Sequence, residues 1–166
     1  MDIDSLYRRH YQELYSFAYQ MTFSKPESED LVQESFCRLL NESKIGTSIQ
    51  QPRAWLYKVL LNLTRTRFSV EKQHNEKLKL VDKNEISSDD IHHAYIEKEK
   101  RRIITNELNL LPDKDRNILI LYHQGLAYSE IAEALEMNTS SVGTTLARAI
   151  EKLADNLKKK HHELFE

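Results

Sequence analysis

The chain has 166 residues, a formal net charge of −2, three glycines and three prolines. This length fits one domain or two small ones, and the scarcity of glycine, proline and β-type alternation favours an all-α protein. The near-neutral charge excludes a polycation, so any contact with nucleic acid must come from local basic clusters. The lone cysteine, Cys37, excludes an intrachain disulfide and indicates a reducing compartment.

Neither the N-terminus nor the hydropathy pattern carries a targeting signal. The first residues are acidic, unlike the basic start and apolar run of a signal peptide. No apolar run approaches the roughly 20 residues that span a bilayer. We therefore expect a cytoplasmic protein without membrane insertion.

Three helices are expected in residues 1–70. The first begins after Asp4, which is a favourable N-cap residue. The second begins after Ser24, which forms a capping-box pattern with Glu27. The third begins near Pro52, because proline suits the first turn of a helix.

The third expected helix lies in a basic and aromatic part of the chain. Residues 43–70 contain five basic residues, no acidic residue and three interleaved aromatic residues. Basic charge mixed with aromatic rings suits a phosphate backbone and unstacked bases. A solvated basic face above core aromatics is the alternative interpretation.

Residues 71–88 differ in composition from both flanking parts. Four lysines alternate with four acidic residues, and the segment has no clear apolar periodicity. We expect a flexible tether, disordered or loosely helical, between two small helical domains at residues 1–70 and 89–166.

The second expected domain contains the pattern of a helix-turn-helix. A helix capped by Ser88 or Asp89 runs to Leu110, and a further helix ends near Gly125, which is expected to form a left-handed C-cap. Residues 127–149 then form two short helices with apolar faces, joined by a tight turn in which Glu136 takes a left-handed conformation. The second helix of such a pair usually enters the major groove of DNA. An ordinary helix pair in an all-α core is the alternative.

Catalytic and metal-binding patterns are not found in the sequence. It contains no nucleophile–base set, glycine-rich phosphate loop or paired-carboxylate motif, so we expect no enzyme activity and no cofactor. The pairs His92–His93 and His161–His162 lack accompanying ligands, and neighbouring side chains diverge on a helix, so no metal is expected. Cys37 lies near an apolar stripe and is expected to be a small buried hydrophobe, with redox sensing as the alternative.

The order of several motifs resembles the extracytoplasmic-function group (group IV) of bacterial sigma-70 RNA polymerase sigma factors. Residues 30–36 (DLVQESF) resemble the family's region 2.2 helix, and residues 52–59 with Asn62 resemble its region 2.4 helix. Region 4 is resembled by Leu111–Pro112, Arg116, residues 125–132 and residues 146–149. The resemblance covers nearly the whole chain apart from the tether and the last few residues.

This resemblance implies binding to core RNA polymerase, to promoter DNA and to an anti-sigma factor. The implied polymerase-binding residues are Asp30, Gln33 and Glu34. The implied minus-ten element contacts are Arg53, Trp55, Lys58, Asn62, Arg65 and Arg67. The implied minus-thirty-five element contacts are Thr139, Ser140, Ser141, Gly143, Thr144 and Arg148.

The function implied is that of a sigma factor that binds core polymerase and directs it to specific promoters. One alternative is a homodimeric helix-turn-helix regulator, which leaves residues 30–36 unexplained. Another is a sigma-like protein-interaction module that does not read DNA. Arg148 is the one charged residue among the implied minus-thirty-five contacts, so independent binding to duplex DNA is expected to be weak. The absent side chain of Gly143 is interpreted as allowing close approach to DNA, with a simple loss of helix stability as the alternative.

Overall fold

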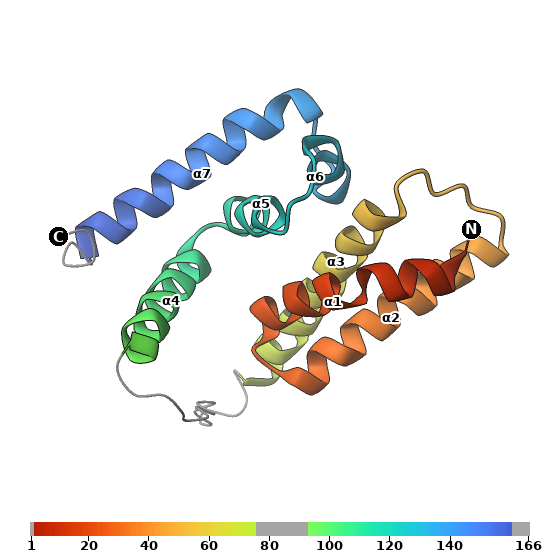
Figure 1. The fold of residues 1–166 in the computed structure, drawn as a ribbon, viewed down its shortest axis with the longest axis horizontal. Helices are drawn as coiled ribbons and strands as arrows, with labels where there is room; N and C mark the ends of the chain where they lie inside the picture. Colours follow the sequence, from red (N-terminus) through yellow and green to blue (C-terminus); the bar gives the residue numbers. More distant parts are fainter. Residues whose placement is uncertain (1, 76–92, 161–166) are drawn as a thin grey trace.

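A computed structural model describes residues 2–75 and 93–160 of the chain (Figure 1). These ranges contain seven α-helices and no strand, as expected for an all-α protein. The helices are α1 (Ile3–Thr22), α2 (Lys25–Lys44), α3 (Pro52–Asn75), α4 (His93–Leu110), α5 (Asp113–His123), α6 (Tyr128–Ala134) and α7 (Thr139–Lys160).

The starts of the first two helices are set by side-chain caps. The prediction of Asp4 as the first cap is wrong, because Asp2 has the extended backbone of a cap and its Oδ1 accepts the Ser5 N–H at 3.2 Å. Asp4 lies in the first turn instead, where its charge suits the positive end of the helix dipole. The predicted Ser24 cap is confirmed, since its Oγ accepts the Glu27 N–H at 3.5 Å.

The third helix is longer than expected. It continues to Asn75, so residues 71–75 are helical, whereas the flexible tether was expected to begin at residue 71. Lysine, glutamate and glutamine have favourable helix propensities, which allows α3 to continue past its packed part. The rest of the expected tether, with the proposed caps Ser88 and Asp89, lies outside the described residues.

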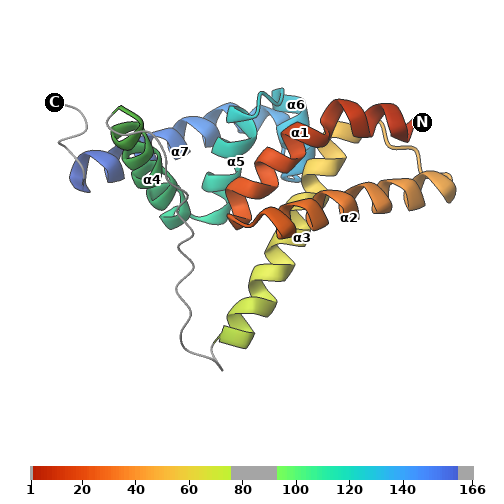
Figure 2. The same ribbon diagram turned by 60° about the horizontal axis from the view of Figure 1, so that its bottom comes forward.

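The helices pack in two groups that touch through α3 and α6. The first three helices pack on one another, and α7 packs on α4, α5 and α6. The most extensive contact between the groups joins α3 to α6, and both views show these helices side by side (Figures 1 and 2). The buried side chains form one continuous cluster that includes Phe17, Leu31, Leu60, Ile131 and Val142. The two halves therefore share a core in this arrangement.

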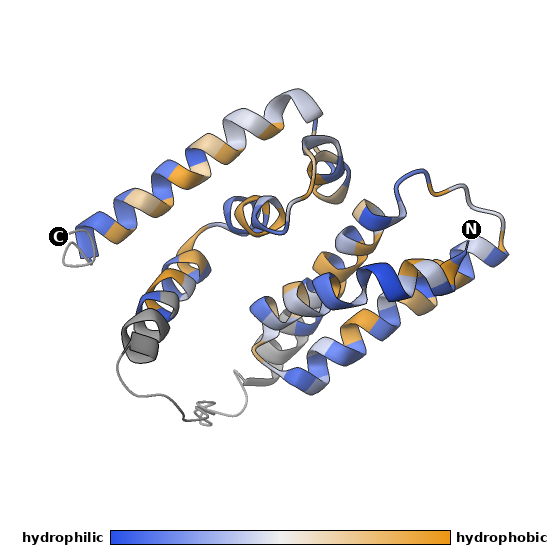
Figure 3. Cartoon of the chain, viewed as in Figure 1, coloured by the Kyte–Doolittle hydropathy of each residue, from blue (hydrophilic) through white to orange (hydrophobic). Residues whose placement is uncertain are grey.

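The apolar faces of the helices follow the expected periodicity. In the helix-turn-helix, Ile131 and Ala132 of α6 are buried, as are Val142, Leu146 and Ala149 of α7. Figure 3 shows the apolar residues of α7 alternating with hydrophilic ones along the helix. Cys37 is exposed, so its expected burial is wrong; it follows the buried Phe36 and faces away from the core.

The turns around α6 depend on two residues with left-handed backbones. Gly125 follows α5 with a φ of 75°, and Glu136 follows α6 with a φ of 52°, as predicted for both positions. Asn138 directly precedes α7, and its main-chain carbonyl accepts the Ser141 N–H at 2.9 Å. Among the described helices, none has the length and apolar character needed to cross a membrane.

Two glycine substitutions are expected to change stability in opposite directions. Gly125→Ala should lower the free energy of unfolding by about 1 kcal/mol, because an added Cβ meets open space but the positive φ disfavours it. Gly143→Ala should raise it by about 1 kcal/mol, since its Cβ would lie at an ordinary 3.5 Å from the Tyr128 ring inside a helix. Urea denaturation followed by circular dichroism measures the free energy of unfolding of each variant. Equal changes in the two variants would contradict the argument from backbone conformation.

Candidate polymerase and nucleic-acid interfaces

The implied polymerase-binding residues lie together on the outer face of α2. Asp30 and Gln33 are exposed and one helical turn apart, and Glu34 lies beside Gln33. The Glu34 carboxylate pairs with the Arg38 guanidinium at 2.8 Å along the same helix. This face therefore offers a negative and polar surface that complements a basic partner.

Four of the implied minus-ten contacts form one stripe along α3. Trp55, Lys58, Asn62 and Arg65 are spaced by three, four and three residues, which places them on one side of the helix. Asn62 and Arg65 are exposed, whereas Trp55 is half-buried against the core. Arg67 is exposed but lies two residues beyond Arg65, about 200° around the helix. The structure therefore separates Arg67 from this stripe.

Arg53 is also separated from the stripe, because it lies in a polar network between the two helix groups. Its Nε and Nη2 donate to the two carboxylate oxygens of Glu13 in α1, each at 3.0 Å. Its Nη1 donates to Glu130 in α6 at 3.0 Å, and Nη2 also donates to the carbonyl of Gln124 at 3.3 Å. One guanidinium thus joins three elements that are distant in sequence.

The charges in this network stabilise one another. The hydrogen bond and charge of Glu13 raise the pKa of Arg53, although its partial burial opposes this. Partial burial alone would raise the pKa of Glu13, but hydrogen bonds from Arg53 and His10 outweigh it and lower that pKa. Burial raises the pKa of Tyr57, whose ring centre lies 5.9 Å from Arg53 Cζ, so the phenol remains neutral. The network therefore holds a fixed cation between two carboxylates.

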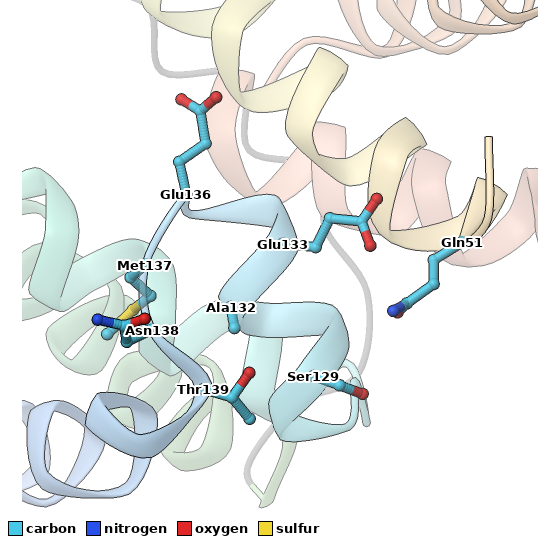
Figure 4. Close-up of a pocket in the computed structure, with 8 residues that line it drawn as sticks. All are labelled: Gln51, Ser129, Ala132, Glu133, Glu136, Met137, Asn138 and Thr139. Carbon is cyan, nitrogen blue, oxygen red and sulfur yellow. The ribbon is translucent and has the colours of Figure 1, made fainter. Parts of the chain in front are cut away.

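A second ion pair joins the helix-turn-helix to the α3 stripe. Lys58 Nζ lies 2.6 Å from a carboxylate oxygen of Glu136. The hydrogen bond and charge of Lys58, followed by the charge of Arg65, lower the pKa of Glu136. Figure 4 shows Glu136 projecting from the turn after α6, at one end of a groove that also includes Gln51. Two predicted nucleic-acid contacts, Arg53 and Lys58, therefore have carboxylate partners.

The first turns of α7 carry most of the implied minus-thirty-five contacts. Thr139, Ser140, Ser141, Thr144 and Arg148 are exposed there. Gly143 is half-buried, and the position of its missing side chain faces the ring of Tyr128. A Cβ at Gly143 would lie 3.5 Å from that ring, an ordinary contact, so the packing of α7 on α6 does not require glycine, and close approach of Gly143 to DNA stays a prediction.

The sequence did not reveal the acidic partners Glu13, Glu130 and Glu136. Glu13 and Glu130 are 40 and 77 residues from Arg53 in the chain, so no local spacing relates them. Glu130 has a local role that conceals the long-range one, because its Oε2 also accepts the Ala127 N–H at 2.8 Å. For Glu136, the sequence indicated only a left-handed turn position and gave no sign of its pairing with Lys58.

No group of three metal-binding side chains occurs in residues 2–75 and 93–160. His92 and the pair His161–His162 lie outside the described residues.

An all-α fold with a basic, aromatic helix and a helix-turn-helix defines a DNA-binding class of protein. Two family models match the two parts of the chain: Sigma-70 region 2 at residues 6–73 and Sigma-70, region 4 at residues 101–153. The chain belongs to the sigma-70 family of RNA polymerase sigma factors, which direct RNA polymerase to promoters.

Curated relatives support this assignment over nearly the full chain. RNA polymerase sigma factor YlaC of Bacillus subtilis is 31% identical over 97% of this chain and 95% of its own length. Ferric citrate uptake sigma factor FecI of Escherichia coli is 30% identical over 91% of this chain and 88% of its own length. Both relatives therefore match the two helical parts together.

Two solved structures share the fold. The sigma factor RpoE, solved in complex with the anti-sigma factor NepR from Bartonella quintana, matches with a TM-score of 0.69 and 18% identity, over 96% of this chain and 99% of that one. CnrH, solved in complex with the cytosolic domain of CnrY, matches with a TM-score of 0.66 and 21% identity, over 95% and 88% of the two chains.

Removing the charge of Glu13 is expected to destabilise the fold in a pH-dependent way. Glu13→Gln should lower the free energy of unfolding at pH 7 by about 1 kcal/mol, because Arg53 loses its paired acceptor. The folded pKa of Glu13 lies below 4.5, so its stabilisation is present above pH 4.5 and is lost as the pH falls through the folded value. Urea denaturation from pH 7 to pH 3 measures this difference.

The matched control is Glu151→Gln, which removes an exposed carboxylate of α7. It should leave stability nearly unchanged across the same pH range. A Glu13→Gln difference that stayed constant below pH 4.5 would contradict the role of the ionised Glu13 carboxylate.

Proposed function

We propose that three surfaces divide the work of this sigma factor. Its α2 face binds core RNA polymerase, its α3 stripe binds the minus-ten promoter element, and the exposed start of α7 binds the minus-thirty-five element. The observation that carries the proposal is the α3 stripe, which combines an aromatic ring, an amide and two cations on one side of a helix. Nucleic acid needs such a combination for both its phosphates and its bases.

The polymerase contact is assigned to Asp30, Gln33 and Glu34. Their exposed, acidic surface suits a basic partner and leaves the buried face of α2 in the core. The contact brings the chain to promoters, where α3 and α7 act at separate DNA elements. Domains at residues 1–70 and 89–166, with the connecting segment between them, provide the two binding units.

Strand separation in this proposal requires no catalysis by the chain. Binding energy for the displaced strand at Trp55 and the neighbouring polar residues offsets the cost of unstacking its bases. We therefore propose a non-enzymatic regulator without a cofactor, which works in the cytoplasm where its polymerase partner acts. Since the RpoE and CnrH structures contain the partners NepR and CnrY, we include an anti-sigma factor among the partners.

Substitutions on α2 test the polymerase contact. Asp30→Ala and Gln33→Ala should each weaken a one-to-one complex with bacterial core RNA polymerase by about tenfold, because each removes a central polar contact. Size-exclusion co-elution and a fluorescence titration at moderate salt measure the complex.

The matched controls for these substitutions are Asp155→Ala on α7 and Gln12→Ala on α1, both at exposed positions. They should bind like the wild type. If the folded wild-type chain formed no complex with core polymerase, the sigma assignment of these residues would be wrong and a homodimeric DNA-binding protein would be favoured.

Charge reversal on α3 separates DNA binding from polymerase binding. Arg65→Glu combined with Arg67→Glu should abolish promoter-dependent transcription, because the arginine of the stripe becomes a repelling anion beside phosphate and the other exposed arginine of α3 is reversed with it. Binding to core polymerase should persist, since α2 is unchanged. In vitro transcription and co-elution measure the two properties, with Arg8→Glu combined with Arg9→Glu on exposed α1 positions as the charge-matched control. Normal transcription by the α3 variant would favour a protein-interaction module.

A further inference from the structure

Two ion pairs with buried carboxylates hold the C-terminal half of α7. Lys152 Nζ donates to Oδ2 of Asp115 in α5 at 2.5 Å, and Lys160 Nζ donates to the two carboxylate oxygens of Glu107 in α4 at 3.2 and 3.0 Å. Asp115 is 8% exposed and Glu107 is 3% exposed, whereas both lysine side chains are half-exposed. Each carboxylate therefore lies inside the fold and meets a cation from the surface of α7.

These ion pairs lie where the apolar packing of α7 is sparse. The buried residues of α7 are Val142, Leu146, Ala149 and Leu157. None of residues 150–156 is buried, and Lys152 lies within this interval. Glu107 is the one buried residue among residues 102–110 of α4. In this half of α7, ion pairs therefore supply contacts that apolar side chains supply at its start.

The two ion pairs contact α7 at different heights and on different sides. Lys152 and Lys160 are eight residues apart, which is about 12 Å along the helix and about 80° around it. Apolar packing has no directional requirement, whereas a hydrogen bond requires its donor and acceptor to be aligned. Two such contacts fix both the rotation of α7 about its axis and its tilt against α4 and α5, which pack on it (Figure 1).

The rotation of α7 affects the residues at its start that are proposed to bind the minus-thirty-five element. Thr144 and Arg148 are exposed there and lie one helical turn apart. A rotation of about 20° moves a side-chain tip at the helix surface by about 2 Å. A binding group must lie within about 0.5 Å of its productive position. A small rotation would therefore remove base contacts without unfolding the helix.

We propose that Asp115 and Glu107 are positioning residues for the minus-thirty-five contact: through Lys152 and Lys160 they set the rotation of α7, so that its exposed start meets the base edges in register. The buried carboxylates act through the lysines and do not touch DNA themselves. The inference rests on the proposed function, since it assumes that the start of α7 binds DNA. No local motif marks these residues, because they are 37 and 53 residues from their lysine partners.

Selection from a DNA library tests the positioning role. Core RNA polymerase reconstituted with each full-length chain is mixed with duplex DNA randomised across the promoter, and the bound DNA is sequenced. The wild type should enrich one minus-thirty-five and one minus-ten sequence. Asp115→Asn combined with Glu107→Gln should lower the minus-thirty-five enrichment by about fivefold, as expected for one weakened base contact. The minus-ten enrichment should stay unchanged, because α3 is unchanged.

The matched control is Asp113→Asn combined with Asp155→Asn, which removes the same number of charges from exposed positions of α5 and α7. Asp113 pairs with Arg116 within α5 and has no role in holding α7. This control should enrich both promoter elements like the wild type. Lys152→Arg keeps a cation beside Asp115, so it should also retain the minus-thirty-five enrichment.

Single variants separate loss of position from loss of folding. Asp115→Asn and Glu107→Gln preserve the shape of each side chain, and water can solvate the half-exposed lysines once the carboxylate charge is gone. Both single variants should therefore remain folded at the temperature of the selection, as measured by thermal unfolding followed by circular dichroism. Each should lower the minus-thirty-five enrichment by less than the double variant.

The outcomes distinguish this inference from the proposed function. Equal minus-thirty-five enrichment in the double variant and the wild type, or an equal loss at both promoter elements, would overturn the positioning role. Absence of any minus-thirty-five enrichment by the wild type would instead overturn the proposed function of α7. A loss confined to the minus-thirty-five element, with the control unchanged, would support the inference.

Discussion

The guanidinium of Arg53 is the point at which the separate parts of this chain meet. It contacts a carboxylate of α1, a carboxylate of α6 and the carbonyl that follows α5. A charged group at this depth is stable only when its donors are paired, and here the paired acceptors come from both halves of the chain. The relative position of α3 and the helix-turn-helix depends on this pairing and on the apolar contact beneath it.

The same residues serve two requirements that conflict. A helix that binds nucleic acid needs exposed cations and an aromatic surface, and α3 supplies them in Trp55, Lys58, Asn62 and Arg65. Exposed cations also attract acidic groups of the chain itself, as Lys58 attracts Glu136. The near-neutral net charge fits this arrangement, because acidic residues elsewhere in the chain offset the basic segment.

The main features of the fold could be predicted from short-range patterns. Apolar periodicity identified the helix-turn-helix, and the Ser24–Glu27 pattern located the start of α2. The start of α1 was misplaced because two aspartates compete as caps within three residues, and only the backbone at Asp2 is extended. The end of α3 was misplaced because a polar, charged sequence is compatible with both helix and tether. The polymerase-binding role of the α2 residues and the DNA-binding role of the α3 residues stay proposals, since both are argued from the exposed surfaces of these helices.

The sequence by itself determined the helical class, the sigma-70 motifs and the basic, aromatic character of residues 43–70, because these depend on residue type and on spacing within a few turns. The tertiary structure decided which cations are paired. It paired Arg53 with carboxylates from both halves of the chain, turned Gly143 toward Tyr128, exposed Cys37 and brought Glu13, Glu130 and Glu136 to α3. The physical reason is that ion pairs between distant residues depend on how helices pack, and local periodicity contains no information about the partner helix.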